Sequence, residues 1–243
     1  MARIVSLVPS ITELVCDLGL AHELVGRTGF CIHPEAALKK IPKVGGTKSV
    51  NLKKIRDLAP THVIVNVDEN RKETAEALAE FVPNVIVTHP LAPLDNLALY
   101  RQIGSAFRRE REAETLCSRF ELSYREIEQR NFPQRKVLYL IWKEPWMTVS
   151  RNTYVSRMLQ LFGMQTVPQE APKRYPELST LEATGAELIL LSTEPYRFRQ
   201  SHRDELQTGL KTPAYLIDGA MTSWYGSRAI RGLRYLADFA TAL

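Results

Sequence analysis

Cysteine is scarce in this chain of 243 residues, which contains Cys16, Cys31 and Cys117. An odd number of thiols cannot pair completely, and no two of them have the C-x-x-C spacing of a zinc or redox motif. The sequence therefore predicts reduced cysteines in a core or a cleft rather than a disulfide framework.

Long apolar runs are also absent, because no stretch approaches the ~20 apolar residues that a membrane-spanning helix needs. Met1-Ala2-Arg3 leads directly into the apolar run 4–8, without the charged region, long apolar region and cleavage site of a secretory leader. We expect a cytoplasmic protein with no membrane insertion, or a periplasmic protein if a leader was removed.

Several catalytic signatures are missing. The glycine-bearing stretch Gly45-Gly46-Thr47 lacks the G-x-x-x-x-G-K-[ST] pattern of a P-loop, and neither G-x-S-x-G nor H-E-x-x-H occurs. The net charge of +5 is mild and the arginines are spread over the chain, so nucleic-acid binding is not expected. These absences argue against a P-loop and against nucleophilic catalysis.

The first part of the chain alternates strands with helices. Apolar runs predict strands at 4–8, 24–26, 62–66 and 84–88, and periodic patterns predict helices at 11–18, 52–58 and 69–81. Ser10-x-x-Glu13 has the spacing of a capping box that would open the first helix, and Asn51 can cap the second. Short connections between these elements predict a parallel sheet covered by helices.

Residues 94–134 form the longest periodic segment. Apolar side chains recur at helical spacing, and charged side chains occupy the other face. Gly104-Ser105 is expected to break this run, which leaves a main helix at about 110–130. At ~1.5 Å per residue such a helix spans roughly 30 Å, the width of a small domain.

The α/β pattern restarts after this helix. We predict strands at 135–142, 146–150, 188–191 and 213–217, and helices at 154–162, 179–184 and 227–239. The predicted fold is therefore α/β with two lobes, 1–94 and 135–243, each a small parallel-type sheet flanked by helices, joined by a helical spine at 95–134. Because ligands bind beyond the carboxyl ends of parallel strands, the cleft between the lobes is the expected site.

Five segments resemble the class III, helical-backbone family of periplasmic substrate-binding proteins, which serve ABC importers of vitamin B12, siderophores and haem. They are RIVSLVPSITELVCDLGL, PKVGGTKSVNLKKIRDLAPTHVIVN, KVLYLIWKEPWMTVSRNTYVSRMLQLFG, YPELSTLEATGAELILLS and TPAYLIDGAMTSWYGSRAIRGLRYLADF. The resemblance covers nearly the whole chain. It implies two α/β lobes joined by one backbone helix, and a small metal complex as ligand.

The family's ligand contacts come from aromatic and polar residues in loops. Matched by motif, the resemblance implies contacts from Phe30, Cys31, His33, Gly46, Thr47, Asn66, Glu69 and Asn70 in the first lobe. In the second part of the chain it implies contacts from Trp142, Trp146, Met147, Tyr175, Trp224, Tyr225 and Arg228. Large flat rings suit a corrin, a porphyrin or a catecholate complex, because they bury apolar area at little entropic cost.

Several of these residues have a second interpretation. Cys31-x-His33 could offer a thiolate and an imidazole to a metal, but two ligands are too few for a closed zinc site, and the alternative is a plain loop thiol and a capped histidine. One tryptophan is expected in the core rather than in the site. Arg228, beside Gly226-Ser227, could hold an anion or be a solvated arginine at a helix start.

Two positions depart from the transport members, which carry a docking glutamate early in a helix of each lobe. Here Lys53 and Leu181 occupy those positions, and Glu182 stands one residue late. We expect a binding protein for a cobalt- or iron-containing complex, corrinoid first and siderophore or haem next, with no required cofactor and with an ABC permease as a possible partner. The alternatives are a cytosolic ligand sensor and a metal-dependent enzyme built on Cys31, His33 and Glu69.

Overall fold

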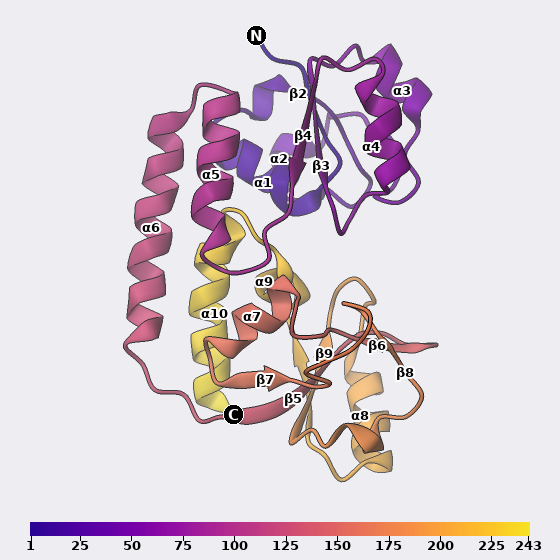
Figure 1. Ribbon diagram of the computed structural model, residues 1–243, viewed down its shortest axis with the longest axis vertical. Coiled ribbons are helices and arrows are strands. Elements are labelled where there is room, and N and C mark those ends of the chain that lie inside the picture. The colour runs from indigo at the N-terminus through magenta and orange to yellow at the C-terminus, as the bar shows by residue number, and fades with distance from the viewer. The chain divides into compact units, whose positions relative to one another are not determined.

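The protein forms two compact units in a computed structural model that describes residues 1–182 and 184–243 (Figure 1). Unit 1 comprises Met1–Pro90, Asp95–Ser118 and Tyr225–Arg228, and unit 2 comprises Leu91–Leu94, Arg119–Trp224 and Ala229–Leu243. The lobe boundaries predicted at residues 94 and 134 stay a prediction, and each unit is described by itself.

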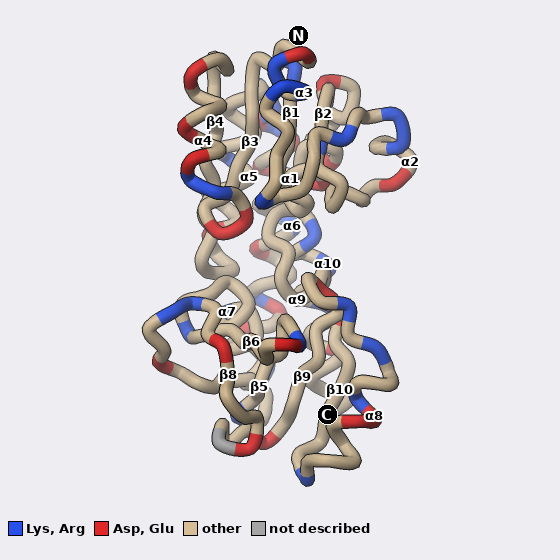
Figure 2. Tube along the Cα trace, turned by 90° about the vertical axis from the view of Figure 1, so that its right-hand side faces the viewer, with Lys and Arg blue, Asp and Glu red and all other residues tan. Residues whose placement is uncertain are grey.

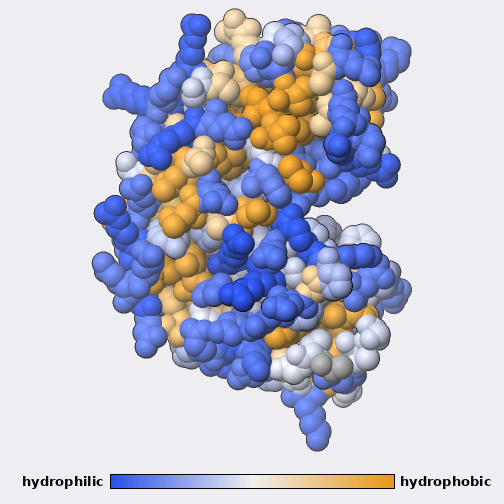
Figure 3. All heavy atoms as spheres, viewed as in Figure 1, coloured by the Kyte–Doolittle hydropathy of each residue, from blue (hydrophilic) through white to orange (hydrophobic). Residues whose placement is uncertain are grey.

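Unit 1 is built on a four-stranded, fully parallel sheet. Its order is β2(Leu24–Arg27), β1(Ile4–Ser6), β3(His62–Asn66), β4(Asn84–Thr88). The continuous apolar runs form these strands because both faces of the inner strands are covered. The edge strand β4 is less covered, with Val87 49% exposed, and hydrophobic side chains gather over it in Figure 3.

Short helices cover both faces of this sheet. They are α1(Pro9–Asp17), η1(Ala21–Glu23), α2(Glu35–Leu38), α3(Leu52–Asp57) and α4(Lys72–Ala79). Ile55 of α3 and Leu78 of α4 pack with Val5 and Val63 in one core cluster. The predicted cap of α3 is confirmed, since Asn51 Oδ1 accepts a hydrogen bond of 2.9 Å from Lys54 N.

The predicted capping box at Ser10 is wrong. Helix α1 begins two residues earlier than predicted, with Pro9 in its first turn and Val8 at the N-cap, and no side chain caps it. Proline suits this position because its missing N–H would have no intrahelical partner. Glu13 is consequently free of a capping role and forms a buried ion pair described below.

The long segment folds as two helices, α5(Asp95–Ala106) and α6(Glu110–Glu128). The predicted division into a short helix and a main helix from Glu110 is confirmed, but the break lies after Gly104-Ser105, because α5 continues through these residues and the chain turns at Arg108, whose φ is +55°. A Cβ atom at Gly104 would lie 2.6 Å from the Cβ of Ala113. Glycine therefore allows the close approach of α5 to α6 instead of ending α5.

Unit 2 contains a six-stranded mixed sheet. Its order is β10(Ala214–Ile217), β9(Leu188–Ser192), β5(Arg135–Trp142), β6(Trp146–Thr148), β8(Glu177–Leu178), and β7(Met164–Thr166) also pairs with β5. The pairs of β5 with β7 and β9, and of β9 with β10, are parallel. Strand β6 pairs antiparallel with both β5 and β8. The predicted α/β class is confirmed.

The helices of unit 2 include some that the sequence did not predict. All the helices described for this unit are α7(Tyr154–Gln160), η2(Glu182–Thr184), α8(Gln200–Gly209), α9(Gly219–Ser223) and α10(Arg228–Ala242). The first residue of α10, Arg228, belongs to unit 1. Helix α8 contributes Leu206 to a core cluster with Leu138, Leu140 and Ile189. Strands β7 and β8 and helices α8 and α9 were not expected.

Candidate ligand-binding site

Two asparagines form a polar frame at the carboxyl end of β3 in unit 1. Asn66 Oδ1 accepts hydrogen bonds from Asp68 N at 2.8 Å and Glu69 N at 3.3 Å. Asn70 Oδ1 accepts from Asn66 N at 2.8 Å, and Asn70 Nδ2 donates to Leu7 O and Thr47 O. Both side chains are buried, so they shape the loops around the site more than they offer a surface to a ligand.

The carboxylate of Glu69 is held by Tyr225. The Tyr225 hydroxyl donates to Glu69 Oε1 at 2.6 Å, and its ring is only 8% exposed. Burial first, and then the nearby Glu69 charge, raise the pKa of Tyr225 well above its ordinary value. Two residues 156 positions apart in the chain are thereby joined in unit 1.

Arg228 forms a buried ion pair with Glu13. Its Nε and Nη2 donate to the two carboxylate oxygens at 2.6 and 3.0 Å, and the side chains are only 7% and 6% exposed. This fork-to-fork geometry uses the Nε–Nη2 edge of the guanidinium, and the side chain is buried. The placement of Arg228 therefore does not support the predicted ligand contact.

Cys31 points into the interior of unit 1. Its Sγ lies 3.1 Å from the hydroxyls of Thr12 and Thr28, and burial raises the pKa of the thiol. His33 follows in a half-buried loop position. Among the described residues, no group of three or more His, Cys, Asp or Glu side chains could hold a metal ion. The geometry thus gives the predicted pair no further ligands.

An exposed apolar surface lies in the loops that follow β2 and β3. Phe30 is 62% exposed and touches the glycine segment, because a Cβ at Gly46 would come 3.3 Å from a carbon of its ring. Ile32 and Val67 are 49% and 52% exposed. Sequence reasoning found Phe30 and Gly46 but missed the two aliphatic residues, which carry no signal other than their position after a strand.

Aromatic rings gather at the carboxyl ends of β5 and β9 in unit 2. Trp142 is 41% exposed and meets the ring of Tyr196 edge-on, with 5.5 Å between the ring centroids. Tyr196 lies 4.7 Å from Phe198, and Phe198 stacks on Trp146 at 6.2 Å. Trp142 is therefore the exposed member of a cluster whose other rings brace it. Tyr196 and Phe198 were not predicted as site residues.

A cation flanks this cluster. Lys143 Nζ lies 5.6 Å from the ring centroid of Trp146 and forms an ion pair of 2.9 Å with Glu205. The hydrogen bond from Lys143 lowers the pKa of Glu205, and the same bond raises the pKa of Lys143. This pair fixes the turn between β5 and β6 against α8.

The remaining predicted residues of unit 2 have mixed surroundings. Trp224 is 8% exposed, and its Nε1 donates to Glu194 Oε2 at 2.8 Å, so it is largely a packing residue. Met147 is half-buried in β6, opposite Glu177 of β8. Tyr175 is half-buried, and the Arg174 guanidinium lies 5.7 Å from its ring centroid.

Lys53 and Leu181, which stand where transport members carry a docking glutamate, differ in their surroundings. Lys53 is exposed on α3, a basic helix in Figure 2, and pairs with Asp57 at 2.7 Å. Leu181 is buried in the core of unit 2 and cannot present a charge. Glu182, beside it, is exposed and accepts a hydrogen bond from the Thr180 hydroxyl, which lowers its pKa.

Comparison with known families identifies the class of protein. The model of the periplasmic binding protein family matches residues 4–208, and the chain belongs to this family. A curated relative, the vitamin B12-binding protein of Pectobacterium carotovorum, is 23% identical over 99% of this chain and 89% of its own length. The family resemblance predicted from the sequence is confirmed.

Solved structures show the same fold. The periplasmic vitamin B12 binding protein BtuF of Vibrio cholerae matches with a TM-score of 0.84, at 15% identity, over 99% of this chain and 97% of that one. The periplasmic haem-binding protein RhuT of Roseiflexus, in its apo form, matches with a TM-score of 0.83 at 22% identity, over 99% and 97%.

These relatives are binding proteins and not enzymes, and the molecules named in their descriptions are bound substrates rather than required cofactors. The chain is accordingly a binding protein of the periplasmic binding protein type. Within the described residues, no helix combines the length and apolar character needed to cross a membrane.

Proposed function

We propose that this protein binds a metal complex with a large flat or ring-bearing surface, a corrinoid such as cobalamin first, and a ferric siderophore or haem next. The observation that carries the proposal is the braced, exposed Trp142 at the carboxyl end of β5. A ring that is already held edge-on by Tyr196 loses little entropy when a flat ligand covers it.

The names of the relatives agree with this ligand class. The curated relative is named for vitamin B12, and the structural neighbours for vitamin B12 and haem. In unit 1, the exposed Phe30, Ile32 and Val67 supply apolar surface. The Glu69 carboxylate, oriented by Tyr225, supplies a hydrogen-bond acceptor for polar groups at the ligand's periphery.

Delivery to an ABC-type permease is the transport role that the family resemblance implies. Lys53 stands where transport members carry a glutamate, and a lysine would repel the arginines that such a glutamate meets. Docking at this face would therefore require an acidic group on the permease. A Lys53→Glu variant that stimulates the ATPase of a permease better than the parent protein would contradict this requirement.

A thermal-shift panel tests the ligand class. The full chain is melted with cyanocobalamin, haemin or a ferric catecholate, and with metal-free protoporphyrin as a control. A ligand that binds only the folded state stabilises it by about 2.7 kcal/mol at a concentration of 100 Kd. We expect one metal complex to raise the Tm and to change its own absorption spectrum. The absence of both changes for every complex would overturn the proposal.

A further inference from the structure

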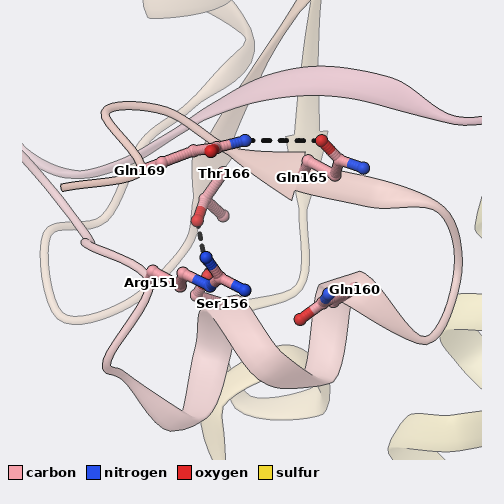
Figure 4. Close-up of a pocket in the computed structure, with 6 residues that line it drawn as sticks. All are labelled: Arg151, Ser156, Gln160, Gln165, Thr166 and Gln169. Carbon is pink, nitrogen blue, oxygen red and sulfur yellow. Dashed lines mark hydrogen bonds between the residues drawn. The ribbon is translucent and has the colours of Figure 1, made fainter.

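A cavity of about 240 Å³ that is open to solvent and lined by polar residues lies in unit 2, between α7 and β7. Its lining residues are Arg151, Ser156, Gln160, Gln165, Thr166 and Gln169. Figure 4 shows that these side chains come from α7, β7 and the adjoining loops. At the liquid-water volume of about 30 Å³ per molecule, this space holds roughly eight waters, which corresponds to a small molecule of similar size.

The cavity is separate from the aromatic cluster of the same unit. Thr166 pairs with Val137 near the start of β5, whereas Trp142 is at its end. Trp142 is five positions after Val137 in the extended strand, which corresponds to about 16 Å at ~3.3 Å per residue. A ligand on the exposed face of Trp142 therefore leaves this cavity unused.

The cavity floor is a pair of buried hydroxyls. Ser156 Oγ and Thr166 Oγ1 are 2.5 Å apart and link α7 to β7. Both residues are almost fully buried, at 5% and 3% exposure. One hydroxyl hydrogen serves the bond between them, so the pair retains a second hydrogen to donate.

Side-chain amides form the wall of the cavity. Gln169 Nε2 donates to Gln165 Oε1 at 3.4 Å, and Gln165 Nε2 donates to Gln134 Oε1 at 3.0 Å. Gln160 is one helical turn after Ser156, so both face the cavity. Each amide presents a donor and an acceptor, which suits a ligand with hydroxyl groups.

The single charge in the lining is positive. Among the described residues, the guanidinium of Arg151 makes no hydrogen bond or ion pair, and no carboxylate lines the cavity. Its backbone N–H donates to Gln169 O at 3.4 Å, which attaches the Arg151 turn to the cavity wall. An arginine fork with open donors matches a carboxylate in a bidentate geometry.

We propose that this cavity binds a small hydroxy acid, with its carboxylate on Arg151 and its hydroxyl groups on the glutamine amides and the Ser156–Thr166 pair. The ligand is organic, anionic and without a large apolar surface, because no aliphatic or aromatic side chain lines the cavity. This is a second binding site, of a chemistry unlike that of the site around Trp142.

NMR titration of the full chain at constant ionic strength tests the proposal, with L-malate, inorganic phosphate and glycerol as probes. We expect malate to shift the amide signals of the lining residues, and Arg151→Ala to weaken its binding at least ten-fold. Arg157 lies on α7 outside the lining, so Arg157→Ala is the matched control and is expected to bind malate within two-fold of the parent protein.

Three outcomes would overturn the proposal. They are an equal loss of malate binding in the Arg151→Ala and Arg157→Ala variants, tighter binding of phosphate than of malate, and equal shifts with uncharged glycerol. Because Arg151 is exposed, its replacement leaves the core intact, and an unchanged Tm of the variant verifies this.

Discussion

The two units present their strand ends in different ways. In unit 1 five of the ten predicted site residues are buried, and Asn66, Asn70, Cys31 and Arg228 each have hydrogen-bond partners in the unit. In unit 2 the most prominent predicted residue, Trp142, leaves two fifths of its surface exposed. The buried site residues of unit 1 thus form a preformed polar frame, whereas Trp142 in unit 2, like Phe30 in unit 1, is an exposed ring that still has area to bury.

This difference separates two kinds of contribution to binding. Residues of the polar frame act through stability and loop position, because their bonds are satisfied before any ligand arrives. An exposed ring acts through the apolar area that the ligand covers. Variants in the two regions should therefore change different quantities.

The largest expected effect is on stability and comes from Arg228→Ala. Removing one partner of a buried ion pair takes the guanidinium away from the buried Glu13 carboxylate, which costs about 3–5 kcal/mol of the free energy of unfolding. Urea denaturation measures this loss. The exposed pair of Lys53 with Asp57 is the control, and Lys53→Ala should leave the urea midpoint nearly unchanged. Equal midpoints for the two variants would remove the distinction between buried frame and solvated surface.

The alkylation rates of Cys16 and Cys31 should show how inaccessible these two thiols of unit 1 are in the folded protein. The pKa of Cys16 is raised from 9.0 to about 12, chiefly by burial, so at pH 8 its thiolate fraction falls from roughly one in ten to one in ten thousand. Alkylation by iodoacetamide at pH 8 should be about 1,000-fold slower than for a free cysteine. Burial also raises the pKa of Cys31, and we expect it to react slowly too. Rapid labelling of Cys31, mapped by mass spectrometry, would show instead that this thiol is accessible.

The exposed ring should govern affinity. Trp142→Ala is expected to weaken the binding of the metal complex about 30-fold, or ~2 kcal/mol, because the ligand loses an apolar surface to cover. Tyr215, 37% exposed on β10, is the matched control for removing an exposed ring from the same unit. Titration calorimetry of both variants decides the comparison. Equal affinities for the two variants would place the ligand elsewhere.

The smallest expected effect belongs to Tyr225→Phe, which removes the hydrogen bond to Glu69. Water can replace the lost partner of the half-buried carboxylate, so we expect a loss of about 1 kcal/mol of stability. The pKa of Tyr225 is raised in the folded protein, so stability that is present below pH 10 falls as the pH rises above the unfolded value of 10.0. The variant should lose less stability between pH 10 and 11 than the parent protein. A steeper loss would contradict the assigned direction.

Local sequence patterns predicted most of the fold. The four strands of unit 1 and the helix at 110–128 follow from apolar runs and helical spacing, which depend on near neighbours in the chain. Helix α8 was not predicted because its sequence is polar and Leu206 is its one buried side chain. Strands β7 and β8 have three and two residues, too short to show a period.

The site was harder to predict because its decisive contacts join distant residues. Glu13 and Arg228 are 215 positions apart, and no local pattern pairs them. Ser10-x-x-Glu13 suggested a local role for Glu13, but Pro9 opens the helix and leaves that carboxylate for Arg228. The rings of Tyr196 and Phe198 did have a signal, since two alternating aromatic residues follow a strand end.

The four residues Tyr225–Arg228 belong to unit 1, while the chain on both sides of them belongs to unit 2. They bring the partner of Glu13, the hydroxyl bound to Glu69, and a carbonyl, Gly226 O, that accepts a hydrogen bond from the Tyr100 hydroxyl. A gene fragment that ends after α6 would therefore encode a first half in which Glu13 lacks the guanidinium of Arg228. Dissection of this protein into independent halves requires grafting that tetrapeptide, not merely choosing a cut point.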